Sequence, residues 1–428
     1  MLGTALLLLV ALLAVSVPVA AVMGVLGLAL NQFFSSIPLY LAMGDIVWNA
    51  SSEYILIAIP MFVMLGEILL RSGIAHRVYA AIATWLSWLP GGLMHANIGT
   101  CAMFAATSGS SVATAATVGV VALPQVAIRR YDEPLFLGTL AAGGTLGILI
   151  PPSINFILYG LLTQTSVPRL YLAGMIPGLL LTGFFMAIIL VYCLVWPAKG
   201  GTLVETGWRD RLRSLKDLVA PLFIFGVVVG SIYAGWATPT EAASMGVFAA
   251  LVLAAWERAL SWPMIKAVFE GTMRTTAMIM LIIIAAQFLN FVLANIGVTD
   301  GVAKAIDALG LGKVGTMLLL IVFYLILGCF METISMMILT TPFVFPIVVG
   351  LGWDPIWWGI VLTILIEAAL VTPPVGLNLY VVQSLRSTGA IADVIRGALP
   401  FVAAMFGLIL LLMAFPDIAL GLPRWVMG

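Results

Sequence analysis

The stretch Gly147-Ile148-Leu149-Ile150-Pro151-Pro152-Ser153 recurs 222 residues later as Ala369-Leu370-Val371-Thr372-Pro373-Pro374-Val375. Each copy lies inside an apolar segment long enough to cross a bilayer, which takes about 20 residues of helix. Two consecutive prolines remove two N–H donors and clash with the preceding helical turn. The helix therefore has to open at each proline pair, which leaves carbonyl oxygens free on one half-helix and N–H groups free on the other.

The same offset relates other parts of the chain, which indicates an internal repeat. Ala20-Ala21-Val22-Met23-Gly24-Val25 matches Ala242-Ala243-Ser244-Met245-Gly246-Val247, and Pro124 matches Pro346. Chance similarity among Leu-, Ala- and Val-rich runs is the alternative, but chance does not keep one offset from Ala20 to the proline pair. The sequence therefore predicts two copies of one arrangement of helices.

The composition places these copies in a membrane. Of 428 residues, 63% are hydrophobic and 8% are charged, whereas soluble domains carry about 25% charged residues. The formal net charge is zero, so nucleic acid is not an expected partner. The three cysteines share no CxxC spacing and are interpreted as small residues of apolar segments.

We therefore predict an all-α polytopic membrane protein with two inverted repeats, each holding a re-entrant helical hairpin and a broken transmembrane helix. A single first span is expected over 3–30, and an additional helix near 218–237 has no predicted counterpart in the first repeat. The predicted boundaries are 1–197 for the first repeat (hairpin 93–125, broken helix 134–165), 198–217 for a cytoplasmic linker, and 218–428 for the additional scaffold helix and the second repeat (hairpin 314–349, broken helix 355–385).

The placement of basic residues predicts the orientation. With a cytoplasmic N-terminus, 14 of the 18 Lys and Arg residues fall on or near the cytoplasmic face and 4 fall outside. Cytoplasmic loops carry such an excess. The linker is then cytoplasmic, the C-terminus is periplasmic, and the two hairpins enter the membrane from opposite sides.

Polar residues at membrane depth mark the candidate site. Thr107-Ser108-Gly109-Ser110-Ser111 lies between the limbs of the first hairpin, and the offset places Glu332 opposite Ser110. Such backbone must be buried in protein or line a cavity. The carbonyl oxygens of an opened helix suit a hard cation such as Na⁺, and the N-termini of half-helices suit a carboxylate.

Four residues are candidates for substrate binding: Glu332, Asn155, Asn378 and Ser153. A carboxylate inside a membrane segment is by default a functional hypothesis, whereas Glu67 is weaker because it can pair with Arg71 four residues on. The two asparagines can equally well satisfy the opened backbone. Proline kinks and small residues also occur in membrane helices without any binding function.

Four motifs together resemble a known family: SGSSVATAA (108–116), GILIPPS (147–153), GWATPTEAA (235–243) and VTPPVGLNLY (371–380). They resemble the large membrane subunit of tripartite ATP-independent periplasmic (TRAP) transporters, over essentially the whole chain. The resemblance implies an elevator-type permease of the bacterial inner membrane, driven by Na⁺ and without an organic cofactor. It further implies a periplasmic substrate-binding protein that delivers an organic acid, and a small four-helix membrane subunit as partner.

The resemblance also implies two Na⁺ sites, each where a hairpin meets a broken helix. The first would use Ser108, Ser110 and Ser111 with the backbone of Gly147, Ile150 and Pro152. The second would use Gly328, Ala369, Thr372 and Val375, and it departs from the family, which usually has glycine where Ala369 stands.

Other functions stay open at this point. A stand-alone dicarboxylate or citrate carrier with the same hairpins would need no partner subunits. An intramembrane enzyme would need an unusual dyad of Ser110 with His95, and the chain lacks HExxH, so no enzymatic activity is expected. A channel is disfavoured because no ring of charges or repeated carbonyl motif is visible.

Overall fold

The computed structural model describes residues 2–15, 17–108, 110–202, 206–298, 301–302, 304, 309–386 and 388–428. Over these ranges the regular secondary structure is helical, apart from one isolated β-bridge between Tyr131 and Gly200. Seven of the described helices are long and apolar enough to cross a membrane, and a pair bent by 46° at a short break would make an eighth. The prediction of an all-α polytopic membrane protein is confirmed.

The two repeats appear as two series of helices. The first comprises α1 (Leu2–Ala14), α2 (Val19–Phe34), η1 (Leu39–Ala42), α3 (Met43–Ser52), η2 (Tyr54–Ile57), α4 (Ala58–Arg71), α5 (Ile74–Leu86), α6 (Leu93–Ser108), α7 (Ser111–Ala122), α8 (Pro124–Arg129), α9 (Glu133–Leu149), α10 (Ile154–Thr163) and α11 (Val167–Val195). After η3 (Pro197–Lys199), the second comprises α12 (Trp208–Tyr233), α13 (Pro239–Trp256), α14 (Trp262–Asn295), α16 (Gly312–Leu327), α17 (Thr333–Gly350), α18 (Pro355–Val371), α19 (Leu377–Ser384), α20 (Ile391–Ala414) and α21 (Asp417–Met427).

The broken helices obey the offset at both ends. Asp132 caps α9 by accepting a hydrogen bond from the Leu135 N–H at 3.2 Å, and Asp354 caps α18 by accepting from Ile356 and Trp357 at 2.7 and 3.2 Å. Both helices run for 17 residues and end just before their proline pairs. The sequence signals for a helix start and a helix stop are thus repeated 222 residues apart.

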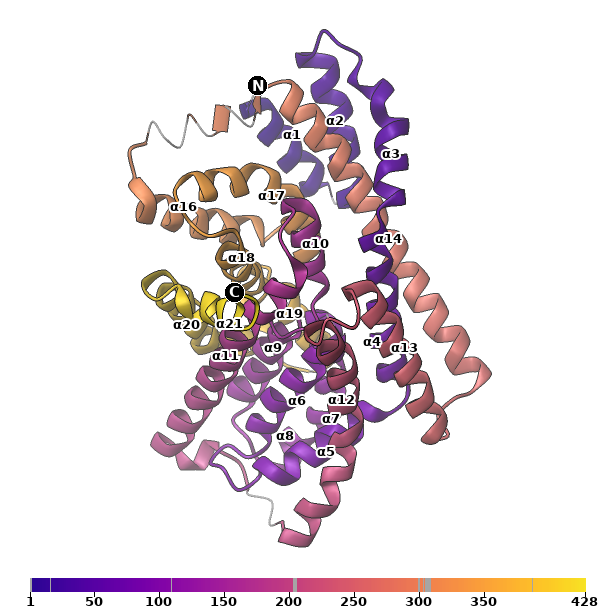
Figure 1. Cartoon of the computed structure of the whole chain (residues 1–428). Helices are drawn as coiled ribbons and strands as arrows, with labels where there is room; N and C mark the ends of the chain where they lie inside the picture. Colours follow the sequence, from indigo (N-terminus) through magenta and orange to yellow (C-terminus); the bar gives the residue numbers. More distant parts are fainter. Residues whose placement is uncertain are drawn as a thin grey trace.

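The first predicted span is wrong. Residues 3–30 form two helices, α1 and α2, because Pro18 disfavours helical backbone at the residue before it and becomes the N-cap of α2. The short connection makes α1 and α2 neighbours that run in opposite directions. The N-terminus therefore lies at the end of the molecule where α2 ends, the upper end of Figure 1, while α5 and α8 lie at the lower end.

This division also corrects the prediction about the additional helix. With the offset of 222, α1 corresponds to 224–236, which covers the C-terminal part of α12 and the three residues after it. The first repeat therefore has a counterpart of α12 with half its length. Likewise α14 corresponds to 40–73, where the first repeat has the shorter helices η1, α3, η2 and α4 in place of one long helix. The predicted boundary between linker and helix at 217 falls inside α12, which begins at Trp208.

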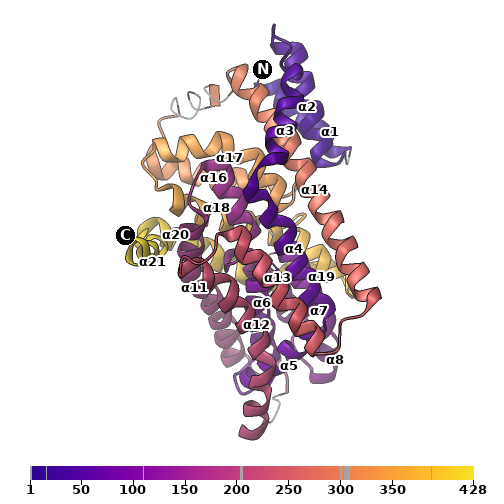
Figure 2. The same ribbon diagram turned by 45° about the vertical axis from the view of Figure 1, so that its right-hand side comes forward.

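The helices form a buried centre and an outer arm. Every residue of α18 from Trp357 to Val371 is buried, and α9 is buried from Leu135 to Leu149. The hairpin α6–α7 and the helix α20 pack around α9. The outer arm consists of the long helix α14, which runs along one side of the molecule, with α2, α4 and α13. Figures 1 and 2 show this arrangement.

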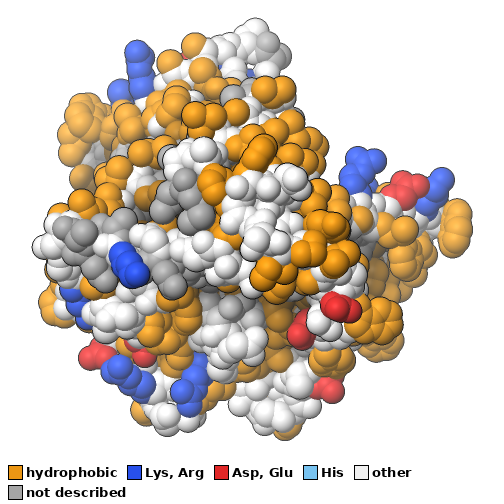
Figure 3. Space-filling model, turned by 90° about the horizontal axis from the view of Figure 1, so that it is seen from above, with side chains coloured by type: hydrophobic (Ala, Val, Ile, Leu, Met, Phe, Trp, Pro, Cys, Tyr) orange, Lys and Arg blue, Asp and Glu red, His pale blue; other side chains and the backbone are white. Residues whose placement is uncertain are grey.

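The outer surface is apolar, as a lipid environment requires. In Figure 3, hydrophobic side chains cover much of the face seen from above, and the charged side chains are few and lie mostly towards its edges. Large exposed side chains on the arm helices include Trp256, Trp262 and Phe269. Exposed apolar surface of this extent is expected of a protein that contacts lipid or another membrane subunit.

Candidate functional site

The first junction is the contact between the hairpin α6–α7 and the end of α9. Gly147 lies in the last turn of α9, and a Cβ atom there would lie 3.2 Å from the Thr114 hydroxyl and 3.3 Å from the Ser110 carbonyl oxygen. Ser110 is also the N-cap of α7, where its hydroxyl accepts from the Ala113 N–H at 3.4 Å. Oxygen atoms of the hairpin thus meet the helix at the point where it opens.

The remaining residues predicted for this junction lie close by in the chain. Ile150 ends α9 in an extended conformation, directly before the cis Pro151–Pro152 bond. Ser108 ends α6, and its side chain, like Gly109, lies outside the described residues. Ser111 contacts the other repeat: its hydroxyl donates a hydrogen bond to the Glu367 carboxylate at 2.6 Å. Thr114 is a further neighbour of this junction, and its role was not predicted from the sequence.

The second junction is the contact between the end of α16 and the end of α18. Gly328 follows α16, and a Cβ atom there would overlap the methyl group of Ala369. The offset places Ala369 opposite Gly147 and Gly328 opposite Ala106, so alanine and glycine have exchanged places between the repeats. The glycine of the hairpin therefore makes room for Ala369, the residue that departs from the family pattern.

Thr372 and Val375 flank the second cis proline pair, Pro373–Pro374. Thr372 caps the end of α18, and its hydroxyl donates to the Ala368 carbonyl at 2.6 Å. The hydroxyl proton is occupied by this bond, whereas the oxygen keeps lone pairs for a cation. The two junctions thus present the same elements, a hairpin and an opened helix, with different side chains.

A cavity of about 350 Å³ lies between the hairpins and the arm helices. Three helices begin at this cavity: α7 at Ser110 and Ser111, α17 at Glu332 and Thr333, and α10 at Ile154 and Asn155. The arm contributes residues of α4 and α14 to the opposite wall: Val63, Gly66, Glu67, Leu70, Thr275, Met278 and Ile279. Helix N-termini that converge in this way favour a bound anion.

Two of the four predicted substrate-binding residues line the cavity. Asn155 is buried, and neither its amide nitrogen nor its amide oxygen has a hydrogen-bond partner among the described residues. Glu332 is the N-cap of α17, where its carboxylate accepts from the Ser335 N–H at 2.9 Å and from the Ser335 hydroxyl at 2.8 Å. Part of the Glu332 carboxylate is therefore occupied by the protein itself.

The other two candidates are buried but do not belong to the lining of this cavity. Ser153 is fully buried, and its hydroxyl has no hydrogen-bond partner among the described residues. Asn378 donates through its amide to the Ala141 carbonyl at 3.2 Å, so it ties α19 to α9. This contact gives Asn378 a structural role between two helices, although Ala141 lies inside α9 and not in the opened backbone.

The arm helices also contribute residues to the cavity that were not predicted from the sequence. Glu67 does pair with Arg71 at 2.8 Å, as its spacing predicted, but it also lines the cavity. Thr275 reaches the cavity from α14, and hydropathy gives no signal for it because a threonine in a long apolar helix is common.

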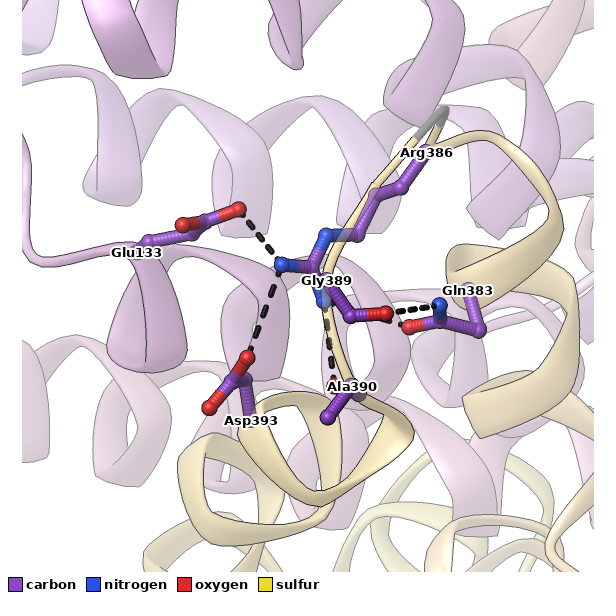
Figure 4. A network of polar contacts seen from close by, with 6 residues as sticks. All are labelled: Glu133, Gln383, Arg386, Gly389, Ala390 and Asp393. Atoms are coloured by element: carbon purple, nitrogen blue, oxygen red, sulfur yellow. Dashed lines mark hydrogen bonds and ion pairs between the residues drawn. The ribbon is translucent and has the colours of Figure 1, made fainter.

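A polar network anchors the second broken helix to the first. Arg386 follows α19, and its guanidinium lies 2.7 Å from the Glu133 carboxylate and 3.6 Å from the Asp393 carboxylate, as Figure 4 shows. It also donates to the Gln383 side chain at 3.1 Å and to the Ala390 carbonyl at 3.2 Å. The network connects the end of α19, the start of α20 and the start of α9.

The inverted repeats, paired hairpins and broken helices define a membrane transporter. The family model described as "Tripartite ATP-independent periplasmic transporter, DctM component" matches residues 6–418. The chain belongs to this family of large TRAP transporter permeases, as the resemblance implied, and it is not an enzyme. His95, the partner in the rejected dyad, lies 2.9 Å from the Pro90 carbonyl.

Curated relatives and a solved structure agree with this assignment. The C4-dicarboxylate TRAP transporter large permease DctM of Pseudomonas aeruginosa is 34% identical over 89% of this chain and 88% of its own. The isethionate TRAP transporter permease DctMQ of Oleidesulfovibrio alaskensis is 32% identical over 95% of this chain and 64% of its own. The YdaH transporter of Alcanivorax borkumensis shares the fold, with a TM-score of 0.56, 16% identity and 98% of both chains covered.

Proposed function

We propose that this chain is the permease subunit of a Na⁺-coupled uptake system for an organic acid, which a periplasmic binding protein delivers. The observation that carries the proposal is the pair of junctions, where a hairpin meets a helix opened by two prolines, with hairpin oxygens beside the opened helix at the first junction. Opened backbone at membrane depth occurs where it is buried or lines a cavity. In secondary transporters such broken helices hold the coupling ions and the substrate.

Each junction is proposed to hold one Na⁺ ion through oxygen atoms. The first would use Ser108, Ser110 and Ser111 with the backbone oxygens of Gly147, Ile150 and Pro152. The second would use the backbone of Gly328, Ala369 and Val375 with Thr372. Hard cations prefer oxygen ligands, and the free carbonyls at the end of a half-helix carry partial negative charge.

The substrate is proposed to bind in the cavity between the hairpins and the arm, with its acid group at the start of α10. Three helix N-termini meet at this cavity, but the α17 terminus is already capped by the Glu332 carboxylate. The α10 terminus has no side-chain cap, and beside it Asn155 offers a free amide. An acid group at α10 would receive hydrogen bonds that the protein leaves unmade.

The cellular arrangement is proposed from the family and the charges. The relatives named above serve C4-dicarboxylates and isethionate, and the substrate of this chain is proposed to be an organic acid of similar size. A periplasmic binding protein and a small four-helix membrane subunit complete the system in the bacterial inner membrane. The hairpins and broken helices would move as an elevator against the arm helices.

Uptake by reconstituted protein tests the proposal. The chain, its small subunit and its binding protein are placed in proteoliposomes, and uptake of radiolabelled organic acids is measured with an inward Na⁺ gradient, an inward proton gradient or neither. The proposal expects uptake only with the Na⁺ gradient and only with all three components. Na⁺-driven uptake by this chain alone would favour the stand-alone carrier instead.

A further inference from the structure

Glu367 carries a carboxylate that the two proposed Na⁺ sites do not use. It lies on α18, one turn before the helix ends at Val371, and it is 1% exposed. Its Oε2 atom accepts a hydrogen bond from the Ser111 hydroxyl at 2.6 Å. Its Oε1 atom is buried and has no hydrogen-bond partner among the described residues.

The contact joins the two repeats. Ser111 begins α7 in the first hairpin, whereas Glu367 belongs to the broken helix of the second repeat. The Glu367 carboxylate therefore contacts the hairpin of the first junction. In the sequence, Glu367 stands two residues before Ala369, which belongs to the second junction. The offset places Thr145 opposite Glu367, so the first repeat has a hydroxyl, which donates to the Ala142 carbonyl at 2.6 Å, where the second has a carboxylate.

The groups around Glu367 do not balance a negative charge. No ion pair found among the described residues includes Glu367. The N-terminus of α7 and the Ser111 hydroxyl both favour the charged carboxylate. A helix terminus, however, offsets only a fraction of the desolvation free energy of a buried charge. An ionised side chain inside a membrane segment needs a stronger partner.

We propose that the Glu367 carboxylate ligates a monovalent cation of its own, at the contact between the two repeats, in addition to the ions at the two junctions. A cation beside Oε1 would supply the missing charge, and oxygen ligands suit Na⁺. Because repeat one has Thr145 at the matching position, the chain holds one such site rather than a symmetric pair. This inference rests on the proposed Na⁺ coupling and adds an ion to it.

The test measures how Na⁺ stabilises the purified full-length chain against heat, with choline as the ionic-strength control. Wild type, Glu367→Gln and Thr145→Val are compared across a Na⁺ titration. Glutamine keeps the shape and a hydrogen bond for Ser111 but removes the charge. We expect Glu367→Gln to raise the half-saturating Na⁺ concentration by about tenfold or more and to lower the steepness of the curve. Thr145→Val should leave both unchanged.

A second variant keeps the inference falsifiable if Glu367→Gln does not fold. Glu367→Asp preserves the charge but shortens the side chain by one methylene group. If the carboxylate ligates the ion, this change in its position should alter the ratio of the half-saturating concentrations of Na⁺ and Li⁺. A Glu367→Gln curve equal to wild type, or an unchanged ion ratio in Glu367→Asp, would overturn the inference. A wild type that Na⁺ stabilises no more than choline would instead overturn the proposed coupling itself.

Discussion

Thr372 shows how one side chain can serve both the helix and an ion. Its hydroxyl proton bonds the Ala368 carbonyl, so only the oxygen is available to a cation. Thr372→Val keeps the shape and removes that oxygen. We expect the Na⁺ concentration for half-maximal uptake to rise about 5- to 150-fold, which is the effect of losing about 1–3 kcal/mol from one polar ligand.

The same helix offers a matched control for this substitution. Thr363 is also buried on α18, and its hydroxyl also donates to a carbonyl one turn earlier, that of Gly359, at 2.9 Å. Thr363→Val removes the same group away from the junction and should leave the Na⁺ dependence unchanged. Equal effects of the two substitutions would show that Thr372 acts through the helix and not through the ion.

Asn155 and Asn378 are a second informative pair at the residue scale. Asn155→Leu removes an amide without a described partner, so the stability of the protein should be unchanged while the KM for substrate rises about tenfold, or about 1.4 kcal/mol. Asn378→Leu removes the donor to the Ala141 carbonyl and should lower thermal stability, by about 1–3 kcal/mol. Uptake kinetics and thermal unfolding in detergent distinguish the two roles. A stability loss in Asn155→Leu with unchanged KM would contradict the assignment.

At the scale of elements, the second junction depends on the close approach of α16 to α18. Gly328 has φ of −66°, so alanine fits its backbone, but the new methyl group would meet the methyl group of Ala369. We expect Gly328→Ala to separate the hairpin from the broken helix, to cost about 1–3 kcal/mol of stability and to weaken Na⁺-dependent uptake.

The repeat itself supplies the rescue for this variant. Adding Ala369→Gly to Gly328→Ala places the same residue types at these positions as the first repeat has at Ala106 and Gly147. The double variant should regain the Na⁺ dependence of the wild type. Gly226→Ala on α12, where an added Cβ meets no atom within 4 Å, serves as the neutral control. A Gly328→Ala defect that Ala369→Gly does not repair would mean that the exchange of alanine and glycine between the repeats is incidental.

The elements differ in how far the sequence predicts them. The broken helices α9 and α18 follow from repeated signals, an aspartate cap at the start and a proline pair at the end. The division of 3–30 into α1 and α2 depends on a single proline at position 18, a signal that is weak within a continuous apolar run. Local chemistry therefore predicts an element well where several signals coincide at its ends.

At the scale of the whole molecule, the division of the first span changes our expectation for the side of the N-terminus. The basic residues still favour a cytoplasmic segment around Thr202, and the N-terminus then belongs with Ser36 on the periplasmic side. In a chain without Cys101, Cys193 and Cys329, single cysteines at Thr202, Ser36 and Gly428 report on the orientation. A membrane-impermeant maleimide added to whole cells should label Ser36→Cys and Gly428→Cys but not Thr202→Cys. Labelling of all three from one side would contradict this topology.

The site was predictable only where it follows the repeat. The offset points to the hairpin tips and the opened helices, and the structure brings Ser110, Asn155 and Glu332 to one cavity. The opposite wall comes from α4 and α14, and no motif links a residue such as Thr275 to the hairpins. The contact of Ser111 with Glu367 joins positions 256 residues apart, which pairing of repeats at an offset of 222 does not predict.

The stoichiometry of coupling tests the account most directly. In proteoliposomes that hold the complete system, the ratio of internal to external substrate at which net flux stops is measured as a function of the Na⁺ gradient at a fixed membrane potential. Two junctions predict that more than one Na⁺ ion accompanies each substrate molecule, so this ratio should rise with more than the first power of the Na⁺ gradient and should not depend on pH. Substrate flux that ignores the Na⁺ gradient, or that reverses with the proton gradient, would contradict the claim that these junctions hold the coupling ions.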